Sequence, residues 1–211
     1  MARLVWYFDF VSPFSYLQYA GYPELFRRPD TELRPVLFAG LLNHWGQKGP
    51  AEITEKRKQT YRFVAWQARK LGIALRFPPA HPFNPIHVLR LAVALGATPE
   101  VVGTIYGFVW TEGRSVADEW ADLCARLKLS VSDAEARSGA PEIKEQLRKN
   151  GEEAIAAGVF GVPTVLVDGE NFWGFDATAM LLEYLANPQL FNTPEMRRID
   201  ALPIAAERRS R

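Results

Sequence analysis

The alternation of apolar and polar positions at the N-terminus predicts a strand, a helix and a second strand. Residues 4–10 (LVWYFDF) are apolar and rich in aromatic and β-branched side chains, which is typical of a buried strand. Ser12 and Pro13 follow as a helix start, and the helix is expected to continue to about Phe26. Residues 33–38 then predict a second strand. This order is that of a βαβ unit.

The middle of the chain follows a different pattern. From residue 51 to 158 the apolar positions recur mostly at the helical period of about 3.6 residues. Gly72 is expected to end a first long helix, and the segment 78–85, which holds four prolines, is expected to be a loop. Further helix starts are expected at Thr98-Pro99 and Pro141, and further helix ends at Gly96 and Gly158. The residues expected on one face of the first long helix are Ile53, Arg57, Thr60, Val64, Ala68 and Leu71.

Strand patterns return after Gly158. Residues 164–167 and 171–173 flank Asp168-Gly169, which predicts a β-hairpin, and residues 177–185 predict a last helix. The residues beyond Pro194 are expected to form a loosely held basic tail. Its arginines are Arg197, Arg198, Arg208, Arg209 and Arg211.

The order of these elements predicts an α/β protein with a thioredoxin-like fold and an all-helical insertion. Residues 1–40 and 159–195 are expected to form the thioredoxin-like domain, with a four-stranded sheet flanked by helices. Residues 41–158 are expected to form the helical insertion, and residues 196–211 the basic tail. The length of 211 residues agrees with one domain plus an insertion.

Charge and hydrophobicity narrow the classes of function. The chain has 25 Lys and Arg against 24 Asp and Glu, so its net charge is +1, and we expect neither nucleic acid nor a membrane surface as a partner. The 48% of hydrophobic residues is enough for a substantial core. No stretch of about 18 uncharged apolar residues and no export signal is found, so we expect a cytoplasmic protein.

The chain contains a single cysteine, Cys124. One cysteine excludes an internal disulfide, a C-x-x-C redox pair and a cysteine-based zinc site. Cys124 lies in a helical pattern, which favours a small buried hydrophobic residue over a nucleophile. His44, His81 and His87 are too scattered for a metal motif, so we expect solvated or hydrogen-bonded histidines and no metal.

Two segments meet in a thioredoxin-like fold, namely the start of the first helix and the turn before the third strand. The thioredoxin superfamily has a C-x-x-C motif at the first and a cis-proline at the second. Ser12 and Ser15 stand at the two cysteine positions, so this chain cannot itself perform thiol–disulfide exchange. A helix N-terminus stabilises an anion, and the Ser12 hydroxyl can donate a further hydrogen bond to it. The site therefore suits a thiolate brought by another molecule, and glutathione is the abundant cytosolic candidate.

Each of these two signals has an ordinary structural explanation. Ser12-Pro13 alone is a common helix N-cap, and Val162-Pro163 alone is a common strand entry. Their joint occurrence at the two matching positions of one fold favours a functional site.

Further motifs support this interpretation. Residues 8–17 (FDFVSPFSYL), 160–164 (FGVPT) and 172–176 (FWGFD) resemble the 2-hydroxychromene-2-carboxylate isomerases, in the DsbA-like group that includes the kappa-class glutathione transferases. Residues 110–113 (WTEG) resemble a helix end in the inserted domain of that family. The resemblance extends from about Leu4 to Leu185.

The resemblance implies roles for particular residues. Ser12 matches the catalytic serine that holds the glutathione sulfur. Val162, just before the cis-proline Pro163, matches the residue whose main chain pairs with the cysteinyl part of glutathione. The segment that matches the γ-glutamyl site consists of Trp173, Gly174, Phe175 and Asp176. Taken alone, Asp176 is better explained as an ordinary helix N-cap.

Two positions depart from the family pattern, and two further features leave alternatives open. Gln47 stands where the family usually has Asn, and Ala177 stands where an Arg is common, which removes a cation near the glutathione carboxylates.

Asn84 resembles a loop residue near the substrate pocket, where it either binds substrate or forms a turn with Pro85. The basic run 56–58 is either a solvated helix face or a contact for a substrate carboxylate.

The resemblance implies a glutathione-dependent isomerase that acts on a small aromatic carboxylate in aromatic catabolism. Such an enzyme interconverts 2-hydroxychromene-2-carboxylate and trans-o-hydroxybenzylidenepyruvate through a transient glutathione adduct, so that glutathione is regenerated as a cofactor. A homodimer is expected from the resemblance. The first alternative is a kappa-class-like glutathione transferase or peroxidase that acts on electrophiles. The second is a non-catalytic thioredoxin-like module that binds peptides.

Overall fold

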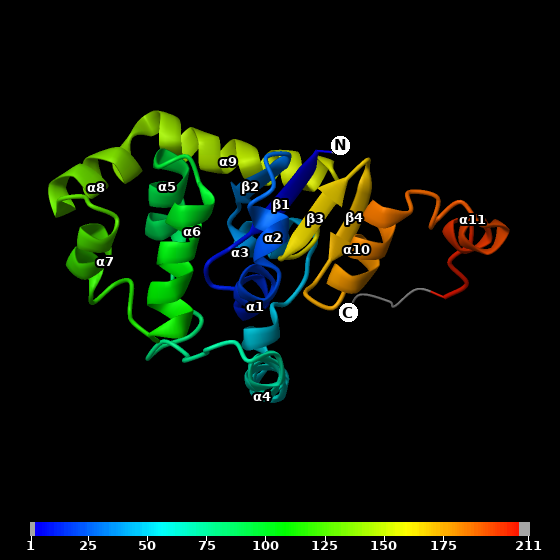
Figure 1. Cartoon of the computed structure of the whole chain (residues 1–211), viewed down its shortest axis with the longest axis horizontal. Coiled ribbons are helices and arrows are strands. Elements are labelled where there is room, and N and C mark those ends of the chain that lie inside the picture. The colour runs from blue at the N-terminus through cyan, green and yellow to red at the C-terminus, as the bar shows by residue number, and fades with distance from the viewer. Residues whose placement is uncertain (1–2, 207–211) are drawn as a thin grey trace.

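The structure is a computed structural model that describes residues 3–206, and its strands form one sheet in the order β2-β1-β3-β4 (Figure 1). β1 (Leu4–Phe8) pairs in parallel with β2 (Thr31–Pro35) and antiparallel with β3 (Thr164–Val167). β3 pairs antiparallel with β4 (Glu170–Trp173). The two ends of the chain thus build one sheet, and the predicted α/β class is confirmed.

The N-terminal helices differ from the prediction in one respect. The single helix expected up to Phe26 is two helices, α1 (Pro13–Gly21) and α2 (Pro23–Phe26). Tyr22 separates them with φ −135° and ψ 56°, because a residue before proline is disfavoured in the helical conformation. The N–H of Tyr22 still donates to the carbonyl of Gln18, which closes the end of α1.

The second strand is also shifted from its predicted position. It spans Thr31–Pro35, and Phe38, which was predicted to end it, instead begins helix α3 (Phe38–His44). The N–H of Phe38 donates to the Asp9 carboxylate at 2.9 Å, so a side chain from the loop after β1 satisfies the start of α3.

The middle of the chain is helical, as predicted. Gly72 ends the first long helix with φ +67°, a left-handed conformation that glycine adopts without steric cost. Thr98 caps the next predicted helix start, since its side chain accepts a hydrogen bond from the N–H of Val101. The helical elements are η1 (Pro50–Glu52), α4 (Thr54–Leu71), α5 (Ile86–Ala94), α6 (Pro99–Tyr106), the π-helical η2 (Gly107–Thr111), α7 (Trp120–Arg126), α8 (Val131–Gly139) and α9 (Pro141–Ala156).

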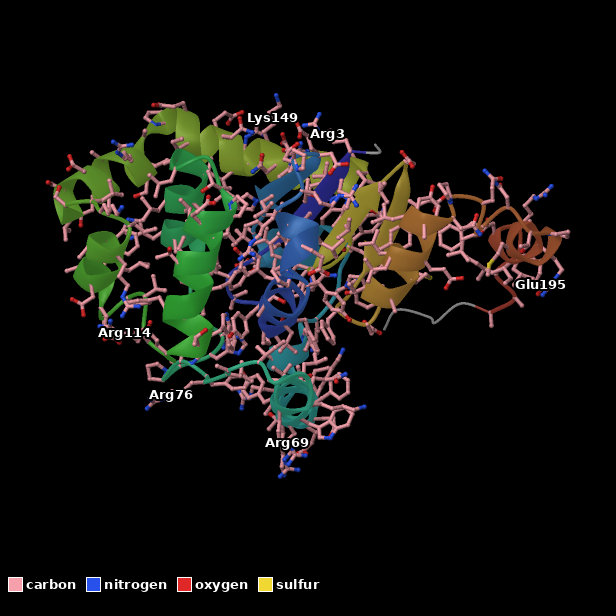
Figure 2. The ribbon with its side chains drawn as sticks, in the orientation of Figure 1. Arg3, Arg69, Arg76, Arg114, Lys149 and Glu195 are labelled. Carbon is pink, nitrogen blue, oxygen red and sulfur yellow. The ribbon has the colours of Figure 1, made fainter. Side chains whose placement is uncertain are left out.

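The long helix α4 lies beside α1 at the margin of the molecule (Figure 1). Of the residues predicted to share one face, Val64 and Ala68 are buried, whereas Ile53 and Leu71 are exposed. The side chain of Arg69 extends away from the body of the molecule (Figure 2). α4 is therefore anchored along a narrow stripe and presents most of its surface to solvent.

One buried cluster joins the sheet to the helices of the middle segment. Trp6 on β1 is fully buried and lies among aromatic rings that include Phe8 and Tyr106. Its indole N–H donates to Gln18 at 2.7 Å, and the Gln18 amide donates to Thr178 at 2.9 Å. This chain of buried hydrogen bonds fixes β1, α1 and the helix that begins at Thr178 relative to one another. The predicted boundaries of the domain and the insertion stay predictions.

The C-terminal region contains two helices, α10 (Thr178–Ala186) and α11 (Pro194–Asp200). Part of the predicted loose tail is thus helical, because Thr193 caps α11 through the N–H of Met196 at 3.2 Å. α11 lies beyond α10, away from the sheet (Figure 1). The predicted tail residues Arg208, Arg209 and Arg211 lie outside the described residues.

Two further sequence predictions can be compared with the structure. Cys124 is a free thiol that is fully buried in α7, beside Leu91 and Ala134, and this position confirms a packing role for its side chain. Across residues 3–206, no helix is both long and apolar enough to cross a bilayer.

Candidate functional site

A cavity of about 510 Å³ lies where the start of α1, the α3–α4 region, the turn before β3 and the end of β4 come together. Its wall contains most of the residues that the sequence singled out, although these come from distant parts of the chain. The predicted residues that line it are Ser12, Gln47, Val162, Trp173, Gly174, Phe175 and Asp176. The cavity is therefore the candidate site.

Ser12 is both a helix cap and a wall residue of the cavity. It precedes α1 with φ −87° and ψ 112°, and its Oγ accepts a hydrogen bond of 3.2 Å from the N–H of Ser15. Pro13 occupies the first turn, where its missing N–H costs no hydrogen bond. The cap uses Ser12 Oγ as an acceptor, so the hydroxyl hydrogen stays available to donate to a bound anion. The two explanations of Ser12-Pro13 are thus compatible.

The predicted cis-proline is present, since the Val162–Pro163 peptide bond is cis. Val162 lines the cavity, whereas Pro163, which was also predicted to belong to the site, does not. Outside the helices and strands, none of the main-chain hydrogen bonds among residues 3–206 involves Val162. Its N–H and C=O can therefore pair with an extended ligand, which is how a peptide adds to a sheet edge.

Trp173 at the end of β4 packs closely over the turn before β3. A Cβ atom at Gly161 would lie only 2.5 Å from the Trp173 indole nitrogen, so this approach requires glycine at position 161. Phe160 meets the Trp173 ring edge-on, with 4.8 Å between the ring centroids. The segments 160–164 and 172–176, which the sequence treats as separate motifs, therefore form one surface.

Asp176 does not cap α10. The N-cap position belongs to Ala177, which makes no side-chain cap, and α10 begins at Thr178. The Asp176 carboxylate instead folds back over Gly174, where a Cβ would lie 2.5 Å from Asp176 Oδ1. Asp176 is exposed at the cavity, so its charge can meet a cationic group of a ligand. The alternative of an ordinary N-cap is wrong for this residue.

Asp9 is a wall residue that the sequence analysis did not propose for the site. It is fully buried, and its two carboxylate oxygens accept from the N–H of Val11 at 3.0 Å and of Phe38 at 2.9 Å. Burial raises the pKa of Asp9 to about 7, although the main-chain N–H donors act in the opposite direction. Asp9 thus connects the loop that carries Ser12 to the start of α3. A signal for it existed, since it is the one charged residue in an apolar run.

His81 and Tyr61 form a second polar feature of the wall that was missed. His81 Nε2 lies 2.7 Å from the carbonyl oxygen of Val11, and its Nδ1 lies 2.6 Å from the Tyr61 hydroxyl. Burial lowers the pKa of His81, which favours the neutral ring. Of the two predicted alternatives, solvated or hydrogen-bonded, the structure supports the second for His81. Its place in the cavity wall depends on contacts between residues 20 and 70 positions apart.

The remaining predicted positions divide into those at the cavity and those outside it. Lys56 of the basic run lines the cavity, together with Lys48 and Glu52. Asn84 does not, although Phe83 and Pro85 on either side of it do. Its Oδ1 accepts from the N–H of Ile86 at 3.0 Å, which supports the turn-forming alternative. Residues 3–206 hold no group of three or more His, Cys, Asp or Glu side chains suited to a metal ion.

The fold and the site define a class of protein. Residues 3–186 match the DSBA-like thioredoxin domain, so the chain belongs to the DsbA-like thioredoxin family. The resemblance drawn from the sequence motifs is thereby confirmed at the level of the family.

Particular relatives can also be named. The 2-hydroxychromene-2-carboxylate isomerase of Sphingobium xenophagum is 30% identical over 187 residues, which cover 85% of this chain and 95% of that protein. The glutathione S-transferase kappa 2 of Caenorhabditis elegans is 27% identical over 209 residues, covering 86% and 91% of the two chains. A solved structure of a 2-hydroxychromene-2-carboxylate isomerase superposes with a TM-score of 0.77 at 24% identity, over 90% of this chain and 97% of the other. This superposition shows a common fold.

Proposed function

We propose that the protein is a glutathione-dependent isomerase that interconverts 2-hydroxychromene-2-carboxylate and trans-o-hydroxybenzylidenepyruvate. The observation that carries the proposal is the convergence of Ser12, Val162 and Asp176 on one cavity, in a chain without a C-x-x-C motif. The isomerase relatives supply the reaction class. A cytoplasmic location, a homodimer and a role in aromatic catabolism belong to the same proposal. The homodimer and the catabolic role rest on the resemblance.

The residues of the cavity fit glutathione. The main chain of Val162 offers a donor and an acceptor to the cysteinyl residue, and Asp176 offers a carboxylate to the γ-glutamyl ammonium. Gln47 and Lys56 line the same cavity and offer an amide and a cation to a carboxylate. Lys56 thus supplies a positive charge in a site where Ala177 lacks the arginine common in the family. When bound, glutathione would supply a thiolate nucleophile.

The start of α1 is suited to hold that sulfur as a thiolate. Ser12 is 94% buried, so a hydrogen bond from its hydroxyl acts at a position with little competition from water. The N-terminal N–H groups of α1 add a partial positive charge at the same place. Together they favour the ionised sulfur over the thiol, which is the form that attacks carbon.

The remainder of the cavity suits an aromatic carboxylate. Its wall is mainly apolar and aromatic, which favours burial of a planar ring, and Lys48, which also lines the cavity, offers a cation to the substrate carboxylate. The apolar wall residues include Phe14, Leu37, Phe38, Leu42, Phe63 and Phe83.

A second candidate is a kappa-class-like glutathione transferase or peroxidase, because the kappa-class relative matches over a similar share of the chain. The two activities differ in the fate of glutathione. An isomerase regenerates glutathione, whereas a transferase consumes one molecule per turnover.

The experiment follows the absorbance of 2-hydroxychromene-2-carboxylate with purified protein, in the presence and in the absence of glutathione. The proposal predicts spectral interconversion only when glutathione is present. An absence of interconversion in both conditions excludes the isomerase. If calorimetry also detects no glutathione binding, the peptide-binding module becomes the better interpretation.

A further inference from the structure

Tyr61 and His81 form a hydrogen-bonded pair in the cavity wall that the glutathione contacts do not use. Tyr61 lies on α4 and His81 in the proline-rich loop before α5, and both line the cavity. The Tyr61 hydroxyl lies 2.6 Å from His81 Nδ1 and 2.9 Å from the carbonyl oxygen of His81. His81 Nε2 lies 2.7 Å from the carbonyl oxygen of Val11, the residue before Ser12. The pair is thus tied to the loop that carries the sulfur-binding serine.

These contacts fix the tautomer of His81. A carbonyl oxygen only accepts hydrogen bonds, so His81 Nε2 carries a hydrogen that it donates to Val11. In the neutral ring Nδ1 is then an acceptor, and the Tyr61 hydroxyl donates to it. The lone pairs of the Tyr61 oxygen stay available to accept a hydrogen bond from a ligand in the cavity.

The same contacts also satisfy the pair after a proton has been added. When Nδ1 is protonated, it donates to the Tyr61 oxygen, and the Tyr61 hydroxyl turns to the carbonyl of His81 at 2.9 Å. Both protonation states of the ring therefore leave every polar atom of the pair with a partner. An arrangement with this property can pass a proton in either direction without a change in the position of its heavy atoms.

Aromatic rings hold the imidazole in place. The ring of Trp110 lies 5.3 Å from that of His81 between centroids, and those of Phe77 and Phe83 lie 6.2 and 6.3 Å away. Burial raises the pKa of Tyr61, and the positive charge of Arg57 opposes this shift only in part. Arg57 is thus the charged group that acts on the Tyr61 hydroxyl. This rigid setting suits a group that must meet one particular oxygen of a ligand.

We propose that Tyr61 contacts the hydroxyl group of the aromatic substrate and, with His81 as the partner that accepts and returns a proton, carries the proton that the isomerisation moves. The inference rests on the proposed function. A 2-hydroxychromene holds a hydroxyl group and the ring oxygen on one carbon. In ring opening, that hydroxyl gives its proton to Tyr61 while Tyr61 passes its own to His81 Nδ1. The bond from carbon to ring oxygen breaks, a ketone forms, and the ring oxygen keeps the electron pair.

The resulting phenolate then recovers the proton from His81 through Tyr61. One proton has moved between two oxygens of the substrate, and no oxidant, reductant or further reactant is consumed. General acid–base help of this kind accelerates reactions by about 100-fold or more.

A binding experiment tests the contact without depending on turnover. Calorimetry compares 2-hydroxycinnamate with cinnamate, which lacks the hydroxyl, in the wild-type protein, in Tyr61→Phe and in Tyr19→Phe. Tyr19 is the matched control, since its hydroxyl donates to the carbonyl of Pro99 and does not line the cavity. We expect an approximately tenfold preference for 2-hydroxycinnamate in the wild type and in Tyr19→Phe, and none in Tyr61→Phe.

The affinity for cinnamate should stay unchanged in all three proteins, which also reports an intact cavity in Tyr61→Phe. A wild-type protein without preference for the hydroxylated ligand, or a preference that survives in Tyr61→Phe, overturns the proposal. Should Tyr61→Phe lose both ligands, His81→Leu decides in its place, because leucine offers no side-chain acceptor to the Tyr61 hydroxyl and leaves Tyr61 present. An undiminished preference in that variant would equally count against the pair.

A turnover experiment adds the proton-transfer step. With saturating glutathione, Tyr61→Phe should lower kcat for the chromene about 100-fold, while the Kd for glutathione stays within about twofold of the wild type. In His81→Gln the decline of kcat on the acidic side of the pH profile should disappear. A kcat within about twofold of the wild type in Tyr61→Phe refutes the proton-carrying role. A wild-type protein that fails to turn over the chromene refutes the proposed function instead, and the binding experiment then decides the contact alone.

Discussion

The main-chain N–H of Gly174 donates a 2.8 Å hydrogen bond to the carbonyl oxygen of Pro163. This bond joins the end of β4 to the cis-proline turn before β3. The two segments proposed to hold the cysteinyl and γ-glutamyl parts of glutathione therefore move as one unit, and the distance between Val162 and Asp176 is set by the fold. A preformed site of this kind reduces the entropic cost of binding an extended tripeptide.

Close packing at this junction predicts a selective effect of Gly161→Ala. The added methyl group would displace Trp173, whose indole nitrogen lies within 2.5 Å of the position of the new Cβ. We expect a loss of about 1–3 kcal/mol in the free energy of unfolding and weaker glutathione binding, measured by urea denaturation and calorimetry. Gly151→Ala in α9 is the control, because its Cβ meets no atom within 4 Å, and it should keep the wild-type affinity. Equal affinities in both variants would contradict the proposed role of Trp173.

Ser12→Ala is expected to affect both stability and turnover. Loss of the cap should lower the free energy of unfolding by about 1 kcal/mol, and loss of the hydroxyl donor should slow turnover roughly 10–1000-fold. Ser130→Ala separates the two effects, because Ser130 caps α8 through the N–H of Asp133 and does not line the cavity. That control should lose similar stability at full activity. Full activity in Ser12→Ala as well would remove Ser12 from the mechanism.

Asp176→Asn should weaken glutathione binding while leaving the fold intact. The substitution removes the negative charge proposed to meet the γ-glutamyl ammonium, and Asp176 makes no cap on which α10 depends. We expect an approximately tenfold higher Kd in calorimetry and an unchanged Tm. An unchanged Kd would show that the ammonium binds elsewhere.

Asp9 predicts a pH dependence of stability. Burial raises its pKa in the folded protein from 3.8 to about 7, so between these values the native state binds more protons than the unfolded state. The contribution of Asp9 to the free energy of unfolding is complete below about pH 4 and is lost as the pH rises to about 7. The loss amounts to at most about 4 kcal/mol. Denaturant titrations between pH 4 and 8 should show this decline in the wild type and a smaller one in Asp9→Asn. Parallel curves for the two proteins would exclude Asp9 as the cause.

The sequence predicted those parts of the site that are encoded by neighbouring residues. Ser12-Pro13 marks a helix start, and Val162-Pro163 marks the turn before a strand, because caps and turns depend on local conformation. The motif was enough to place Asp176 at the site. It could not show that Asp176 does not cap α10, since that depends on where α10 begins.

The contacts that the sequence could not supply are those made across the fold. The Asp9 carboxylate accepts from the N–H of Phe38, 29 positions away, and this bond helps to begin α3 at Phe38. The sequence pattern had placed Phe38 at the end of a strand. His81 meets Val11 across 70 positions, and a lone histidine carries no signal for such a partner. The break between α1 and α2, in contrast, was visible in the sequence as Pro23.

The most direct test of the central claim is the number of substrate molecules converted per molecule of glutathione. Purified protein is mixed with 2-hydroxychromene-2-carboxylate and with glutathione far below the substrate concentration, and both compounds are quantified over time. An isomerase that regenerates its cofactor should bring the two aromatic isomers to equilibrium with glutathione undiminished. Conversion that stops when an equal amount of glutathione has been consumed, or no conversion at all, would contradict the account.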